Sequence, residues 1–147
     1  MDVSRYDRIK GILFGLAAGD RIGGPTRMAV LLAESLADCD CFDQDDVFRR
    51  YLAWWNEDGF DTGPVAGMVF SAVASGQTVE QAVKNAHRDL EGMTAGCNPL
   101  HRTLPLAMAE FIADEQLAEY ARQESSLTHF DPLAGDAAAA GVLLASC

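Results

Sequence analysis

The residues able to do chemistry in this sequence gather in four polar segments that are rich in turn-forming residues. They span residues 20–26, 58–63, 96–102 and 128–131. Carboxylate, imidazole and hydroxyl groups hold hard metal ions and move protons, so these segments are where a site is expected. Each segment also has a simpler explanation as a turn between helices, because Gly, Pro, Asn and Asp favour turns.

Short motifs do not choose between these two explanations. The phosphate-loop pattern G-x-x-x-x-G-K-[ST] does not occur, and no G-x-G-x-x-G follows a predicted strand. Asp20 in "GDRIGGPT" either caps a turn or contacts a ligand. His129 alone is more often a hydrogen-bonded structural residue than a ligand. His101 and Arg102 form either an anion contact or a surface pair, and Cys97 has no base near it in the sequence.

Helical periodicity predicts the elements that must position these segments. The predicted helices begin after Ser4, cover residues 27–37, 45–55, 64–75, 78–90, 105–113 and 115–123, and end with one that follows Asp131. The alternation typical of strands is absent from the sequence. We therefore expect an all-α protein, a single domain over residues 1–147, folded as an orthogonal helical bundle of seven or eight helices. Loops at one end of a bundle can converge on a pocket.

The last predicted helix, "DPLAGDAAAAGVLLASC", is apolar on almost every face. Such a helix is expected to be buried. It is either a central helix of this domain, or it is covered by a partner chain, a second copy or a missing C-terminal half. The sequence leaves these alternatives open.

Composition restricts the classes of partner and compartment. The formal net charge of −11 argues against a nucleic-acid surface, which needs clustered Lys and Arg. No segment has the length of a membrane span, and charges interrupt residues 1–18 where a secretion signal would lie. We therefore expect a cytoplasmic protein with four reduced cysteines. The run "DCDCFDQDD" lacks the glycine and glutamate of a calcium loop, and it is typical of an acidic helix start.

Taken together, the polar segments resemble the ADP-ribosylglycohydrolase family, which includes the dinitrogenase reductase-activating glycohydrolases. The resemblance covers about residues 9–145. It is carried by "GILFGLAAGDRIGGP", similar to the family's opening helix and glycine-aspartate turn, and by "MAVLLAESL", similar to the helix after its aspartate-rich motif. It is also carried, in the family's order, by "YLAWWNEDGFDTG", "AGCNPLHRTLPLAM" and "LTHFDPLAGDAAAA".

The resemblance implies an all-helical hydrolase of the glycosidic bond between ADP-ribose and a protein side chain, with Mg²⁺ as cofactor. An ADP-ribosylated protein or an ADP-ribose-like small molecule would be the partner. Asp20, Asp61 and His129 would be the catalytic residues, and Asp20 and Thr26 the metal ligands. The ligand-binding residues implied in the same way are Gly96, Cys97, Asn98, His101, Arg102 and Asp131.

The sequence departs from the family pattern at the metal motifs. Aligned on Met28, the family's aspartate-aspartate-threonine triplet falls on Gly24, Pro25 and Thr26, of which only Thr26 carries a side-chain oxygen. The family's second metal motif lies beyond the length of this chain, which would then correspond to the N-terminal half of the family fold. Three hypotheses remain: an active hydrolase, a non-catalytic relative that binds ADP-ribose or a nucleotide, and half of a split or oligomeric assembly.

Overall fold

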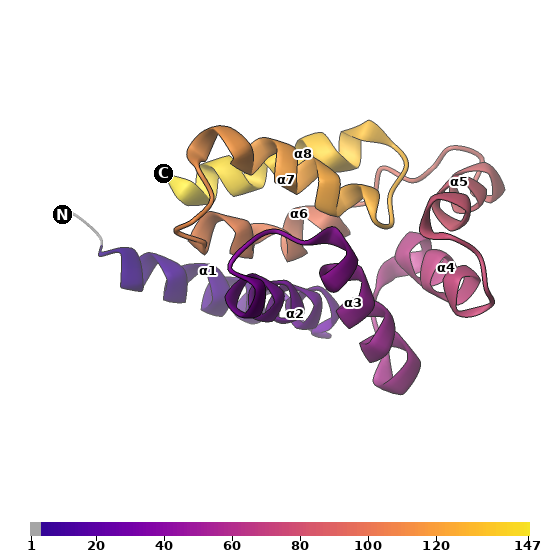
Figure 1. Cartoon of the computed structure of the whole chain (residues 1–147), viewed down its shortest axis with the longest axis horizontal. Coiled ribbons are helices and arrows are strands. Elements are labelled where there is room, and N and C mark those ends of the chain that lie inside the picture. The colour runs from indigo at the N-terminus through magenta and orange to yellow at the C-terminus, as the bar shows by residue number, and fades with distance from the viewer. Residues whose placement is uncertain (1–3) are drawn as a thin grey trace.

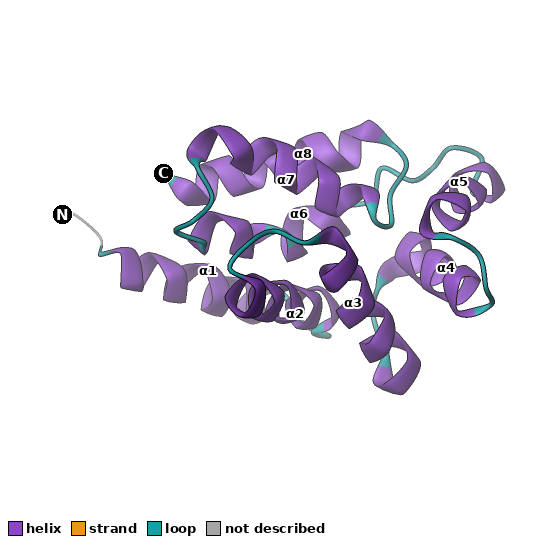
Figure 2. Ribbon diagram, viewed as in Figure 1, coloured by secondary structure: helices purple, strands orange, loops and turns teal. Residues whose placement is uncertain are grey.

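The protein is built from helices, and its computed structural model describes residues 4–147 (Figure 2). These residues form eight α-helices and one 3₁₀ helix, with no strand among them. The helices are α1 (Arg5–Gly19), α2 (Gly24–Cys39), α3 (Gln44–Asp58), α4 (Gly63–Ala74), α5 (Val79–Asp89), α6 (Asn98–Arg102), η1 (Leu104–Met108), α7 (Asp114–Ser126) and α8 (Pro132–Ser146). The predicted all-α helical bundle is confirmed.

The bundle is organised around the short helix α6. Helices α7 and α8 pack side by side, and α6 contacts α8 on one side and α2 on the other (Figure 1). Helices α4 and α5 form a pair at the opposite end of the molecule from the two termini. The largest apolar side chains of the core come from α2, α3, α4 and η1, and they include Met28, Leu32, Tyr51, Phe70 and Leu106.

Local sequence signals set most helix starts. The Ser4 hydroxyl accepts a hydrogen bond from the Asp7 N–H, and Thr78 and Gln81 form a capping box at α5. Asp43 caps α3 through two backbone N–H groups, so the acidic run is a helix start as predicted. The predicted starts therefore hold where a side chain can satisfy the free N–H groups of the first turn.

The segment around the third polar region differs from the prediction. A single helix over residues 105–113 was expected after an irregular stretch, but that stretch contains α6, and η1 ends at Met108. Pro99 and Pro105 lie in the first turns of α6 and η1. Because proline fits a first turn and breaks a helix interior, two prolines six residues apart produce two short helices.

The first and last helices leave apolar side chains exposed. In α1 the apolar residues Ile9, Ile12, Leu13 and Leu16 are only half-buried, Ala17 is exposed, and Phe14 is 70% exposed. In α8 the small residues around Ala138 face the core, while Leu133, Leu143 and Leu144 are exposed. Helix α8 is thus buried on one face only, and the partner expected to cover the other face stays a prediction.

The structure bears on two further expectations, which concern the cysteines and membrane-spanning segments. The four cysteines are free thiols. No helix in the described part of the chain combines the length and hydropathy needed to cross a membrane.

Candidate functional site

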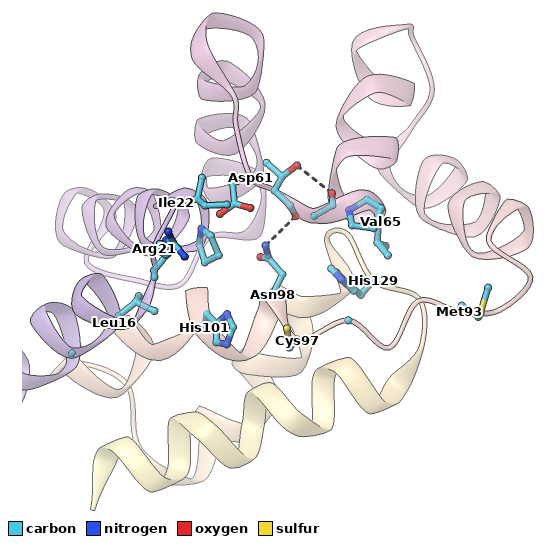
Figure 3. A pocket seen from close by; sticks show the side chains of 18 residues that line it. Leu16, Arg21, Ile22, Asp61, Val65, Met93, Cys97, Asn98, His101 and His129 are labelled. Atoms are coloured by element: carbon cyan, nitrogen blue, oxygen red, sulfur yellow. Dashed lines mark hydrogen bonds between the residues drawn. The ribbon is translucent and has the colours of Figure 1, made fainter.

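The four polar segments approach a single open pocket with a volume of about 720 Å³ (Figure 3). Its walls come from the end of α1, the turn that precedes α2, the start of α4, the segment that leads into α6, and the α7–α8 loop. Residues that line it include Leu16, Asp20, Arg21, Ile22, Pro25, Asp61, Thr62, Val65, Met93, Gly96, Cys97, Asn98, His101 and His129. Its size lies in the range of ordinary small-molecule sites.

Most of the residues predicted for the site lie at this pocket. Asp20, Asp61, Gly96, Cys97, Asn98, His101 and His129 line it. Thr26, Arg102 and Asp131 do not. Asp131 instead caps α8, where its carboxylate accepts a hydrogen bond from the Leu133 N–H at 2.9 Å. Arg102 is fully buried, which excludes the surface pair, one of the two alternatives for His101 and Arg102.

The Asp20 carboxylate is occupied by the turn that follows it. Oδ1 accepts a hydrogen bond from the Gly23 N–H at 2.9 Å, and Oδ2 accepts from the Thr26 N–H and hydroxyl, each at 2.8 Å. Burial raises the pKa of Asp20, but the hydrogen bonds from Thr26 and Gly23 outweigh it and hold the pKa below 3.8. Asp20 and Thr26 are adjacent, as a shared metal site requires, but they bind each other.

Gly24 marks a close contact between two walls of the pocket. A Cβ atom built there would lie 2.3 Å from the carbonyl oxygen of Asp61 and 2.6 Å from that of Phe60. No larger side chain fits at this position unless the backbone moves, since real Cβ atoms do not come so close to other atoms. The start of α2 therefore packs directly on the 60–61 backbone, at the position that the sequence resemblance aligns with an aspartate of the family pattern.

The donor set does not fit the Mg²⁺ site implied by the resemblance. Mg²⁺ needs carboxylate oxygens placed octahedrally and free to bind it. Asp20 has both oxygens engaged, Gly24 and Pro25 offer no side-chain oxygen, and Thr26 donates its proton to Asp20. Among residues 4–147, no group of three or more His, Cys, Asp or Glu could hold a metal ion.

Asp61 is the second acidic residue of the pocket, and its carboxylate is exposed. Its φ of 49° lies in the left-handed region, which Asp tolerates better than most residues. The next residue, Thr62, turns its hydroxyl onto the Gly63 carbonyl and leaves the first turn of α4 without a side-chain cap. The free N–H groups of that turn carry the positive end of the α4 dipole to the pocket wall.

Asn98 connects the α4 side of the pocket with the α6 side. Its amide Nδ2 donates to the Thr62 carbonyl at 3.0 Å (Figure 3), and its Oδ1 accepts from the Arg102 guanidinium at 3.4 Å. Asn98 is nearly buried, so both contacts are shielded from water. One side chain thus fixes the distance between the start of α4 and the start of α6.

Behind Asn98 lies a buried ion pair. Arg102 Nε donates to Glu124 Oε1 at 2.7 Å, and the Tyr51 hydroxyl donates to the same oxygen at 2.8 Å. Arg102 Nη2 donates to the Thr128 hydroxyl at 2.9 Å and to the Glu124 carbonyl at 3.3 Å. Arg102, Glu124 and Thr128 are all fully buried. Removal of one charge would leave the other uncompensated, so this pair holds α6 against α7.

His129 is the pocket residue in contact with this network. Its Nδ1 lies 2.7 Å from the Thr128 hydroxyl oxygen, and the residue is only 4% exposed. Burial and, to a smaller extent, the nearby Arg102 charge lower the pKa of His129 from 6.5 to about 3. The imidazole is therefore neutral near pH 7, which differs from a histidine poised to exchange protons there.

Arg21 and Glu124 are not among the site residues predicted from the sequence. Arg21 is an exposed cation that lines the pocket, and it lies one residue after the aspartate that attracted attention. Glu124 had a recognisable signal, because it follows Leu117 and Ala121 at helical spacing on the buried stripe of α7. An acid on an apolar stripe indicates a buried partner. The partner itself, Arg102, could not be found from spacing alone.

Comparison with known proteins places this geometry in a family. Searches of curated proteins and of solved structures gave no match. The family model for ADP-ribosylglycohydrolase matches residues 25–147, which run from the second residue of α2 to the end of α8 and include every pocket wall except the end of α1 and the Asp20 turn. The match covers most of the sequence, and every regular element within residues 4–147 is a helix. The chain therefore belongs to the ADP-ribosylglycohydrolase family.

Proposed function

We propose that this chain binds ADP-ribose or a closely related nucleotide diphosphate without a metal ion and without hydrolysing it. The observation that carries the proposal is the contact of Gly24 with the Asp61 carbonyl, because it leaves no space for a metal-binding side chain at that position. The family membership supplies the ligand class. The pocket has the volume for a small molecule.

The charges around the pocket suit a diphosphate even though the whole chain is acidic. Arg21 lines the pocket and forms no ion pair with any described residue. The uncapped first turn of α4 adds backbone donors at Gly63 and Val65. The Arg21 charge and the positive end of the α4 dipole both attract an anion. Together they provide positive charge that a bound metal ion would otherwise provide.

Calorimetry tests this proposal directly. ADP-ribose is titrated into the full chain with excess EDTA and, separately, with millimolar Mg²⁺, while product formation from ADP-ribosyl-arginine is followed by chromatography. We expect the same dissociation constant in both buffers and no product. Absence of binding overturns the proposal, and so does binding that needs Mg²⁺ or is followed by turnover.

A pair of arginine variants locates the ligand. Arg21→Gln is expected to weaken ADP-ribose binding about tenfold, because a phosphate contact with a charged donor is lost. Arg27→Gln removes the same charge from an exposed arginine of α2 that does not line the pocket. It is expected to leave binding within about twofold. Equal effects of the two variants would place the ligand elsewhere.

A second candidate function is hydrolysis that depends on Asp61 alone. It is favoured by one observation, namely that the Asp61 carboxylate lines the pocket and accepts no hydrogen bond from the described residues. Glycoside hydrolysis ordinarily uses two carboxylates, and Asp20 is held by its own turn. Turnover in the chromatographic assay that disappears in Asp61→Asn would support this function over simple binding.

A further inference from the structure

A directed chain of hydrogen bonds runs from the buried ion pair to the pocket. Arg102 Nη2 lies 2.9 Å from Thr128 Oγ1, which lies 2.7 Å from His129 Nδ1. A guanidinium has only donors, so Thr128 must accept from Arg102. The hydroxyl has one proton of its own, and Nδ1 of His129 is the acceptor that the structure gives it.

We infer that Thr128 is a positioning residue, which fixes His129 as the tautomer with its proton on Nε2 and so presents a permanent N–H donor to the pocket. In the opposite tautomer, Nδ1–H would donate to Thr128, and the Thr128 proton would be left without an acceptor in a fully buried site. An unsatisfied buried polar group is costly. The low pKa of His129 agrees with a ring that stays neutral.

The geometry around Gly96 places Nε2 at the pocket wall. A Cβ atom built on Gly96 would lie 3.0 Å from His129 Nε2, so the imidazole packs edge-on against the backbone that leads into α6. Figure 3 shows the His129 ring on the pocket side of its loop, and both residues line the pocket. The Nε2–H group is suited to an oxygen acceptor, such as a ligand hydroxyl or phosphate. This use of the donor rests on the proposed function.

The molecule contains a natural comparison for this arrangement. His87 Nδ1 also lies near a threonine hydroxyl, that of Thr94, at 2.6 Å. No guanidinium donates to Thr94 in the described structure, so that hydroxyl can serve either as donor or as acceptor. The two His–Thr pairs therefore differ in the cation behind the hydroxyl, which makes Thr94→Val a matched control for Thr128→Val.

The first test is the tautomer itself, measured on the full chain without ligand. Imidazole ¹⁵N–¹H spectra are recorded from about pH 5 to 8, and the His129 signals are identified by their loss in His129→Gln. We expect the pattern of the neutral Nε2–H tautomer throughout this range. A pattern of the Nδ1–H tautomer, or a ring that takes up a proton within the range, overturns the inference.

The second test concerns the role of Thr128 in binding. Thr128→Val is expected to add the Nδ1–H pattern at His129 and to weaken ADP-ribose binding about tenfold, whereas Thr128→Ser keeps the hydroxyl and restores both. Thr94→Val should change neither. If Thr128→Val folds with an altered tautomer and unchanged affinity, the positioning role is overturned and the proposed function stands. If the wild-type chain binds no ADP-ribose, the proposed function fails while the tautomer is still decided by the spectrum.

Discussion

The two sides of the pocket use charged side chains in opposite ways. On the turn side, residues 20–26, the Asp20 carboxylate accepts hydrogen bonds from backbone and hydroxyl groups within six residues of itself. On the network side, Arg102 and Glu124 lie 22 residues apart in the sequence and join α6 to α7. The Tyr51 hydroxyl, which donates to Glu124, belongs to a residue 73 positions away. The turn side is stabilised locally, while the network side holds distant segments together. A carboxylate near a pocket is therefore not by itself a catalytic group.

The largest effect on stability is expected when one charge of the buried network is removed. Arg102→Met leaves Glu124 buried without its partner, and we expect a loss of about 3–5 kcal/mol in the free energy of unfolding, measured with urea. Arg122→Met is the matched control, because Arg122 forms an exposed ion pair with Asp136 between α7 and α8. It should cost no more than about 1 kcal/mol. Similar losses would mean that burial does not distinguish the two pairs.

The close contact between the walls gives the next largest effect. Gly24→Ala forces a Cβ atom against the Asp61 carbonyl, so we expect a loss of about 2–3 kcal/mol on urea unfolding. Gly11→Ala is the control, since nothing lies within 4 Å of a Cβ added there in α1. That change should stabilise the protein by about 0.5–1 kcal/mol, because alanine favours a helix. A neutral Gly24→Ala would show that the turn side can move apart.

The dependence of stability on pH tests the network side again. Since the pKa of His129 is lowered from 6.5 to about 3 by folding, the unfolded chain binds more protons between these values. Stability is therefore fully present above about pH 6.5 and decreases as the pH falls, by about 3 kcal/mol at pH 4.5. His129→Gln should remove this slope. The lowered pKa values of Asp20 and Asp46 reduce stability further only below about pH 4, so the range from about pH 4 to 6.5 reports His129.

The smallest expected effect is on the turn side. Asp20→Ala removes the acceptor for Gly23 and Thr26 and should destabilise the protein by about 1–2 kcal/mol in thermal or urea unfolding. Asp61→Asn is the control, because it keeps a residue that tolerates positive φ and disturbs no hydrogen bond. Millimolar Mg²⁺ should leave the melting temperature of the wild-type chain unchanged. A rise that disappears in Asp20→Ala would contradict the structural role given to Asp20.

Sequence reasoning succeeded where local chemistry decides the structure. The caps at Ser4, Thr78 and Asp131 were readable because each satisfies N–H groups a few residues away. The expected bundle only made a common pocket possible for the four polar segments, and the structure brings them together. The family match, which begins at Pro25, confirms the membership but leaves the Asp20 turn outside the matched residues.

The sequence did not reveal the contacts between residues that lie far apart in the chain. The role of Arg102 stayed open between an anion contact and a surface pair, because its partners lie in α3 and α7 and no spacing rule joins these helices to α6. The Gly24 contact with residue 61 was also invisible, since a glycine in a turn has several possible reasons. The sequence alone shows that Gly24 and Pro25 carry no metal-binding side chain, and the structure adds that no acid fits at Gly24 unless the backbone moves.

The hydrogen bond between Asn98 and Thr62 has a consequence for the stage of folding at which the pocket forms. The pocket is assembled from segments near residues 20, 61, 98 and 129, so its walls meet only after long loops of chain have closed. Helices form from local contacts and need no such closure, while contacts of high sequence separation form slowly. On refolding, helicity should recover before the Asn98 amide reaches the Thr62 carbonyl. The pocket would then be a late product of folding, and a chain can regain its helices without yet having a site.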